Sequence, residues 1–190
     1  MMHAHPLHTG VQPQKGPWWH GWCCSAMLAI GLTHGIAAWG EALPEYQLKA
    51  AFVYNFASFT EWPSTVGSAL NLCIYGHDPF GPEIDGLNGK SIGARTLLVT
   101  RKHQPEALKT CHIVFIAAPD IQQLPSLLAG IQGLPILVLA DSPGAAQQGV
   151  TLNMKMAQGR VTFEANLGAA RNSGLTLSSR MLRLATEVIQ

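Results

Sequence analysis

Two cysteines and three histidines between residues 73 and 112 are the side chains in this sequence best suited to chemistry. They are Cys73, His77, His103, Cys111 and His112. A thiol next to an imidazole, as in Cys111-His112, pairs a nucleophile with a base. Adjacent residues on a strand point to opposite faces of a sheet, however, so His112 is poorly placed to serve Cys111. The Cys-x3-His spacing from Cys73 is not a usual zinc pattern either, so we expect neither a catalytic thiol nor a metal site.

The segment NGKSIG, residues 88–93, contains Gly-Lys-Ser but does not fit a phosphate-binding loop. Such a loop needs a strand before it, a helix after it and a glycine five positions before Gly89, where this chain has Ile84. Four aspartates are scattered singly at loop or cap positions, where Asp normally stabilises turns and helix N-termini. They are Asp78, Asp85, Asp120 and Asp141. The sequence therefore predicts no active site and no cofactor, and we do not expect an enzyme.

Composition narrows the class of protein further. The chain has 190 residues, of which 47% are hydrophobic and only 12% are charged, against about 25% charged in ordinary soluble domains. The net charge is +1 and like charges form no block, so nothing indicates binding to nucleic acid. So few charges suit either a compact domain with a large buried fraction or a domain with an apolar surface for a partner.

The first 42 residues resemble an export signal more than a folded domain. Lys15 is the only Lys or Arg among them, and the apolar run from Ala26 to Ala38 precedes a stretch of small residues. A membrane-spanning helix needs about 20 apolar residues, and His34 interrupts a run that is already short. We expect residues 1–42 to be a signal peptide with a leader extension, cleaved after Ala38 or Ala42, and residues 43–190 to be one exported domain.

The chain has four cysteines, and Cys23 and Cys24 lie within the expected signal peptide, so export leaves two in the domain. Cys73 and Cys111 are an even, minimal pair, and in an oxidising compartment such a pair predicts one disulfide. The bond would close a loop of 38 residues. The chain-entropy model gives roughly 4 kcal/mol of stabilisation for such a loop.

Aromatic residues at helical spacing predict the first helix, over about residues 46–61, and Pro63 ends it. The apolar stripe of this helix is Leu48, Phe52, Phe56 and Phe59. Asn55 falls between Phe59 and Trp62 on the same side, and a buried amide costs about 1–3 kcal/mol unless it is hydrogen-bonded. We therefore expect Asn55 to be hydrogen-bonded beneath Trp62.

Strand and helix patterns alternate along the rest of the chain. Apolar or alternating segments predict strands at 69–76, 95–100, 112–118 and 135–140, with a helix at 121–129. The segments on either side of MAQG predict an antiparallel hairpin. A short helix and then a final helix are expected after the hairpin. Ser178 should cap the final helix, with its stripe at Met181, Leu182, Ala185, Val188 and Ile189. The pattern predicts a single-domain α/β sandwich, with a mixed, mostly parallel sheet, helices on both faces and a C-terminal hairpin plus helix.

Asn166 and Arg171 are unexpected polar residues in the largely apolar segment FEANLGAARNSG. Together with Asn55 and Trp62 they allow two interpretations. Each is either a structural polar contact, such as an amide that clamps a helix to the hairpin, or a contact with a ligand or partner.

Four blocks of this chain together resemble the YfiR family of exported bacterial regulators. They are YQLKAAFVYNFASFTEWP, LNLCIYGHDPFG, CHIVFIA and RVTFEANLGAARNSGLTLSSRMLRLA, which occur in the same order over residues 46–185. The first and last blocks are the most specific.

The resemblance implies a periplasmic homodimer that represses an inner-membrane diguanylate cyclase by engaging its periplasmic sensor domain. Repression lowers cyclic di-GMP and biofilm formation, and an outer-membrane lipoprotein can sequester the regulator. Cys73 and Cys111 match cysteine positions of the family, whereas the second cysteine pair of some members is missing here.

Such a protein acts by binding, and we expect exposed apolar surface on the aromatic helix and the last helix. The alternative from another class is a periplasmic small-molecule or peptide binding module that feeds a different membrane sensor, with its ligand at the strand ends of the sheet.

Overall fold

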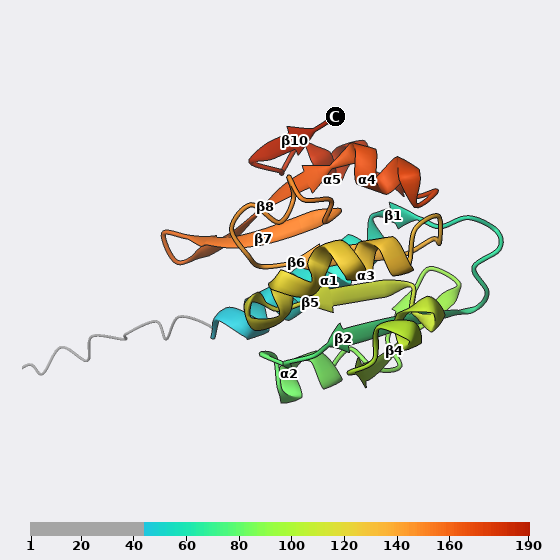
Figure 1. Cartoon of the computed structure of the whole chain (residues 1–190). Helices are drawn as coiled ribbons and strands as arrows, with labels where there is room; N and C mark the ends of the chain where they lie inside the picture. Colours follow the sequence, from blue (N-terminus) through green and yellow to red (C-terminus); the bar gives the residue numbers. More distant parts are fainter. Residues whose placement is uncertain (1–43) are drawn as a thin grey trace, which may run out of the picture. The chain divides into compact units, whose positions relative to one another are not determined.

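The computed structural model describes residues 44–190, which form an eight-stranded mixed sheet with helices packed against it (Figure 1). The strand order is β10-β8-β7-β6-β5-β2-β4-β3. The strands are β2 (Ala69–Tyr75), β3 (Ser91–Ile92), β4 (Arg95–Lys102), β5 (Ile113–Ile116), β6 (Leu137–Ala140), β7 (Leu152–Ala157), β8 (Arg160–Asn166) and β10 (Glu187–Ile189). The short strands β1 (Thr60–Glu61) and β9 (Thr176–Leu177) pair separately.

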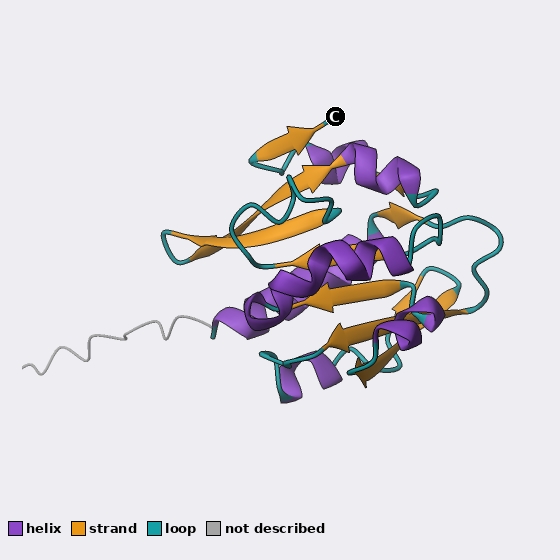
Figure 2. Ribbon diagram, viewed as in Figure 1, coloured by secondary structure: helices purple, strands orange, loops and turns teal. Residues whose placement is uncertain are grey.

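The helices lie on both faces of the sheet, with α1 behind it and α3 in front of it in the view of Figure 2. They are α1 (Glu45–Ser58), α2 (Pro82–Asp85), α3 (Leu124–Gly130), α4 (Leu167–Asn172) and α5 (Ser179–Leu182), with 3-10 helices η1 (Pro105–Thr110) and η2 (Ala118–Gln123). β4, β2, β5, β6 and β7 run parallel, and β3 and the β7–β8 hairpin supply the antiparallel pairs. The predicted fold class is confirmed.

The sheet is buried on both sides, which explains the almost unbroken apolar runs in the sequence. Every residue of β5 and β6 is buried, as expected for central parallel strands. Alternate side chains divide between two cores. Phe115 and Leu139 face α1, whereas Val114 and Val138 face α3.

The predicted hairpin closes with a two-residue turn. Gln158 and Gly159 have φ values of 50° and 73° between β7 and β8. Two successive positive φ angles are typical of the type I′ turn, whose twist matches that of the strands. The MAQG segment therefore determines the register of β7 against β8.

The first helix is shorter than its aromatic pattern predicted. α1 ends at Ser58, and Thr60 begins β1 opposite Leu177 of β9. The Thr60 hydroxyl donates to the carbonyl of Phe56 at 2.7 Å, so Thr60 ends the helix while its backbone joins a strand. The helical boundary at residue 61 was therefore wrong.

The predicted final helix is also wrong in extent. The Ser178 hydroxyl accepts from the backbone N–H of Met181 at 3.2 Å, as expected for an N-cap, but α5 ends at Leu182. Thr186 then donates to the Phe163 carbonyl through both its backbone N–H (2.8 Å) and its hydroxyl (3.0 Å). These bonds direct the chain along the open edge of β8, where residues 187–189 form a parallel strand instead of a helix.

The expected signal peptide, residues 1–42, lies outside the described residues. Within residues 44–190, no helix is long and apolar enough to span a bilayer.

Candidate functional site

Cys73 and Cys111 are joined by a disulfide, as the sequence predicted. Cys73 lies in β2 and Cys111 lies two residues before the start of β5, the neighbouring parallel strand, and the two Cα atoms are 6.0 Å apart. Both cysteines are buried in the core on the α3 face. The bond ties η1, which immediately precedes Cys111, to the centre of the sheet.

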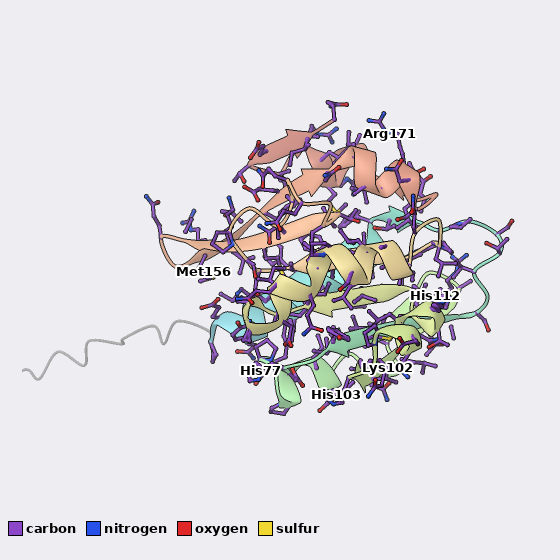
Figure 3. The ribbon with its side chains drawn as sticks, viewed as in Figure 1. His77, Lys102, His103, His112, Met156 and Arg171 are labelled. Atoms are coloured by element: carbon purple, nitrogen blue, oxygen red, sulfur yellow. A yellow bond between two sulfur atoms is a disulfide. The ribbon has the colours of Figure 1, made fainter. Side chains whose placement is uncertain are left out.

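The three histidines of the described residues are dispersed, and each is exposed or structural. The Nδ1 atom of His112 accepts from the backbone N–H of Asn71 at 3.0 Å, and burial, with a smaller effect of Arg95, lowers its pKa. His77 and His103 are exposed and lie at the opposite end of the strands from His112 (Figure 3). Over residues 44–190, no three His, Cys, Asp or Glu side chains come close enough to hold a metal.

Asn55 does not lie where the aromatic stripe predicted. It is exposed, and the row of α1 facing the sheet is formed by Lys49, Val53 and Phe56. At 3.6 residues per turn this row has a different phase from the expected one. Trp62 Nε1 donates to the Ala57 carbonyl at 3.3 Å instead of covering an amide, so a buried Asn55 beneath Trp62 was wrong.

Asn55 instead lines a surface groove of about 350 Å³, which we call the α1 groove. Its lining residues are Gln47, Ala50, Ala51, Tyr54, Asn55, Glu83, Gly86, Leu87 and Lys90. Tyr54 fixes one wall because its hydroxyl donates to the Ser91 carbonyl at 2.9 Å. The groove therefore offers charges of both signs beside an exposed amide. Contact of Asn55 with a partner stays a prediction.

A buried ion pair that the sequence did not predict fastens the start of α1 to the end of β6. Lys49 Nζ lies 2.7 Å from Asp141 Oδ2, and the two side chains are only 4% and 3% exposed. The Tyr46 hydroxyl donates to the same oxygen at 2.9 Å, and Glu45 also pairs with Lys49. Asp141 Oδ1 and the hydroxyl of Ser142 are buried without a partner among the described residues.

The pKa values around this pair shift in one direction. Burial and the negative charge of Asp141 raise the pKa of Tyr46 to about 12. Burial lowers the pKa of Lys49, but hydrogen bonds to Asp141 and Glu45 outweigh it and leave that pKa above its ordinary value. One sequence signal could have indicated that Lys49 is buried. Lys49 stands four residues before Val53, on the apolar row of the helix that reaches the sheet.

Asn166 is held at both ends of its amide. Its Nδ2 atom donates to the Ala146 carbonyl at 2.8 Å, and its Oδ1 atom accepts from the backbone N–H of Ala169 at 2.8 Å. The second bond caps α4, so Asn166 joins the end of β8, the start of α4 and the loop before β7. This geometry matches the structural alternative, a clamp between helix and hairpin.

A second buried polar group lies on β7 and β8, and sequence reasoning missed it. Asn153 Nδ2 donates to the Ser142 carbonyl (2.9 Å) and to Glu164 Oε2 (3.0 Å), and Lys155 pairs with Glu164. Burial raises the pKa of Glu164, but the bonds from Lys155 and Asn153 leave it below its ordinary value. Its only sequence signal was the alternation of β7 and β8, which places Asn153 opposite Glu164.

Three of the four large apolar side chains that are exposed among the described residues come after residue 150. Leu184 is 72% exposed, and Met156 and Val188 are also exposed. The fourth exposed large apolar residue of the described part is Leu98 on β4. Met156 pairs with half-buried Val161 across the hairpin. We call Met156, Val161, Leu184 and Val188 the C-terminal apolar surface.

The two expected sources of exposed apolar surface differ in outcome. In the aromatic helix Phe56 is buried and Phe52 half-buried, so α1 contributes little. The region of the expected last helix does carry exposed apolar residues, although on a turn and a strand. Arg171 is exposed near this region, and its Nη2 atom donates to Gln190 Oε1 at 3.2 Å (Figure 3).

Comparison with protein families gives a match to the family described as YfiR/HmsC-like, over residues 46–186. The match runs from the start of α1 to the residue before β10.

Two solved structures align with part of this chain. One is the ABC domain from Streptococcus pneumoniae in complex with L-Trp, with 9% identity and a TM-score of 0.48 over 63% of this chain and 55% of that chain. The other is a conserved domain protein from Vibrio cholerae O1 biovar El Tor, with 7% identity and a TM-score of 0.49 over 76% of this chain and 60% of that chain. This chain thus spans little more than half the length of either.

Proposed function

Because this chain belongs to the YfiR/HmsC-like family, we propose that it represses an inner-membrane diguanylate cyclase by binding the cyclase's periplasmic sensor domain. The family is regulatory and periplasmic, not catalytic. The observation that carries the proposal is the extent of the family match, which covers residues 46–186 and therefore both sheet faces and the disulfide.

The C-terminal apolar surface is our candidate for the contact with the cyclase. Exposed apolar surface marks partner sites in soluble domains, and Leu184 is the most exposed large apolar residue of the described part. Arg171 hydrogen-bonds to Gln190, two residues after Val188, and would add a polar contact, as is typical at the edge of protein interfaces. Leu184 would be the anchor of this contact.

The regulator changes the cyclase by selecting one of its conformations. It binds the inactive form of the sensor domain more tightly than the active form and so shifts the equilibrium toward the inactive form. The shift is limited by the difference between the two affinities. Lower cyclic di-GMP and less biofilm follow, and an outer-membrane lipoprotein that sequesters the regulator reverses both. The active species is a homodimer, and the disulfide keeps its shape.

A pair of matched substitutions tests the proposed surface. Leu184→Asp places a charge at its most exposed residue, whereas Leu98→Asp places the same charge on β4, at another exposed apolar residue. Each full-length variant is expressed in the native host, cross-linked and purified from membranes. We expect Leu184→Asp to lose at least 90% of the co-purified cyclase and Leu98→Asp to retain it. Equal recovery of cyclase by both variants contradicts this surface.

A further inference from the structure

A second groove, on the α3 face, differs in chemistry from the α1 groove. It measures about 470 Å³ and lies where α3 ends, β7 begins and β8 runs into α4. We call it the α3 groove. Its lining residues are Leu128, Ala129, Ile131, Gln132, Gly133, Val138, Gln147, Gln148, Gly149, Thr151, Asn166, Gly168, Ala169, Asn172 and Ser173. Its volume is within the range of small-ligand sites.

The lining of the α3 groove contains no charged and no aromatic side chain. Side-chain amides of Gln132, Gln148 and Asn172 line it together with aliphatic Leu128 and Val138. Side-chain amides both donate and accept hydrogen bonds, as peptide groups do. The groove therefore combines partners for a polypeptide backbone with a place for an aliphatic side chain.

Part of the wall of the α3 groove is fixed by the fold. Thr151 is 1% exposed and Asn166 is 9% exposed, and both amide ends of Asn166 are already bonded to backbone. A Cβ atom on Gly149 would lie 3.0 Å from Leu128 Cδ1, and one on Gly168 would lie 3.3 Å from Asn166 Oδ1. Glycine at these two positions lets the walls pack closely, so the groove is set by the fold.

Because the lining is uncharged, some classes of ligand fit the α3 groove better than others. A free peptide or amino acid carries a charged amine and a carboxylate, and burying an unpaired charge is costly. A neutral sugar usually stacks on an aromatic ring, and no ring lines this groove. An interior segment of a polypeptide has neither charged terminus, and its backbone amides match the amides of the walls.

We propose that the α3 groove binds an uncharged, extended interior segment of a partner polypeptide, with one aliphatic side chain against Leu128 and Val138. The lining of this site shares no residue with the C-terminal apolar surface, and the proposal does not depend on the identity of the cyclase as partner. The backbone of the segment hydrogen-bonds to side-chain amides of the groove, Asn172 among them.

Titration of the full domain with four probes tests the ligand class, with NMR chemical shifts or calorimetry as the readout. The probes are acetyl-Ala-Val-Ala-amide, the same tripeptide with free termini, acetyl-Ala-Asp-Ala-amide and chitotriose. We expect saturable binding of the capped valine peptide, at least tenfold weaker binding of the other two peptides, and shifts confined to the groove. Preference for the uncapped peptide or for chitotriose, or no saturable binding of the capped peptide, overturns the proposal.

Matched substitutions locate the site. Asn172→Asp adds one negative charge to the α3 groove at nearly constant shape, and Asn55→Asp adds the same charge to the α1 groove. Asn172 and Asn55 are both exposed, so both variants should fold. We expect Asn172→Asp to weaken the capped peptide at least tenfold and Asn55→Asp to change its affinity less than twofold. Equal effects of the two variants overturn the assignment.

Discussion

The two faces of the sheet are fastened in different ways. The α1 face has one 14-residue helix, a core of aromatic rings and a buried ion pair between Lys49 and Asp141. The α3 face has only short helices, and the Cys73–Cys111 bond lies within its core. A long helix can be held to the sheet along several turns, whereas a 3-10 helix such as η1 is short and has poorer hydrogen-bond geometry. The covalent bond thus lies on the face that has only short helices.

The grooves on the two faces differ as well. The α1 groove contains Glu83 and Lys90, whereas the lining of the α3 groove is uncharged. Each groove contains one of the two amides that stood out in the sequence. Asn55 is exposed and Asn166 is buried and fully bonded, so the same residue type serves the surface on one face and the fold on the other.

The largest expected effect is loss of the ion pair on the α1 face. Lys49→Met leaves the Asp141 carboxylate buried without its cation, and we expect the free energy of unfolding to fall by about 3–5 kcal/mol. Urea denaturation of the purified domain measures it. Glu45→Gln is the control, since the Glu45 side chain is 45% exposed, and it should cost less than about 1 kcal/mol. Similar losses for both variants would contradict the role of burial.

The same ion pair predicts sensitivity to alkali. The pKa values of Lys49 and Tyr46 are raised in the folded state, that of Tyr46 to about 12. A raised pKa contributes stability that is complete below the unfolded value and is lost as pH rises through the folded value. Stability should therefore fall between about pH 10 and 12 in the native protein, and less in a Tyr46→Phe variant. A flat profile in both proteins would contradict this.

On the α3 face we expect a slightly smaller effect from removing the disulfide. The double variant Cys73→Ser/Cys111→Ser should lose about 2–4 kcal/mol, because the unfolded chain is no longer constrained. Thermal unfolding with and without reductant measures it. Reductant should lower the Tm of the native protein toward that of the variant and leave the variant unchanged. A native Tm that stays high after complete reduction, shown by thiol counting, would contradict this account.

The two amides give the smallest effects and the sharpest contrast. Asn166→Ala removes the cap of α4 and the shorter of the two hydrogen bonds to the buried Ala146 carbonyl, which should cost about 2 kcal/mol. Asn55→Ala should change stability by about 0.5 kcal/mol or less, because exposed positions tolerate substitution. Chemical denaturation of both variants is sufficient. If Asn55→Ala is the more destabilising, our assignment of the two amides is wrong.

The sequence predicted features that depend on local pattern. The alternation of apolar strands with helices gave the mixed sheet, MAQG gave the hairpin, and the even cysteine count gave the disulfide. Each of these follows from nearby residues or from simple counting.

The missed features depend on contacts between distant segments. Asp141 looked like a turn residue, because nothing near it in sequence shows that Lys49 lies against it. Val188 and Ile189 fit the apolar stripe of a helix as well as they fit a strand. They form a strand because the edge of β8 was open for pairing. The phase of α1 was wrong because its aromatic residues lie partly on the flank of the helix, whereas Lys49, Val53 and Phe56 face the sheet.

The most direct test of repression by binding is the concentration of cyclic di-GMP in the native host. Deleting this gene should raise cyclic di-GMP severalfold, and expression of the full-length chain should restore it, provided that the partner cyclase is present. In a strain without that cyclase, the deletion should have no effect. Unchanged cyclic di-GMP after the deletion, in a strain that expresses both proteins, would contradict the central claim.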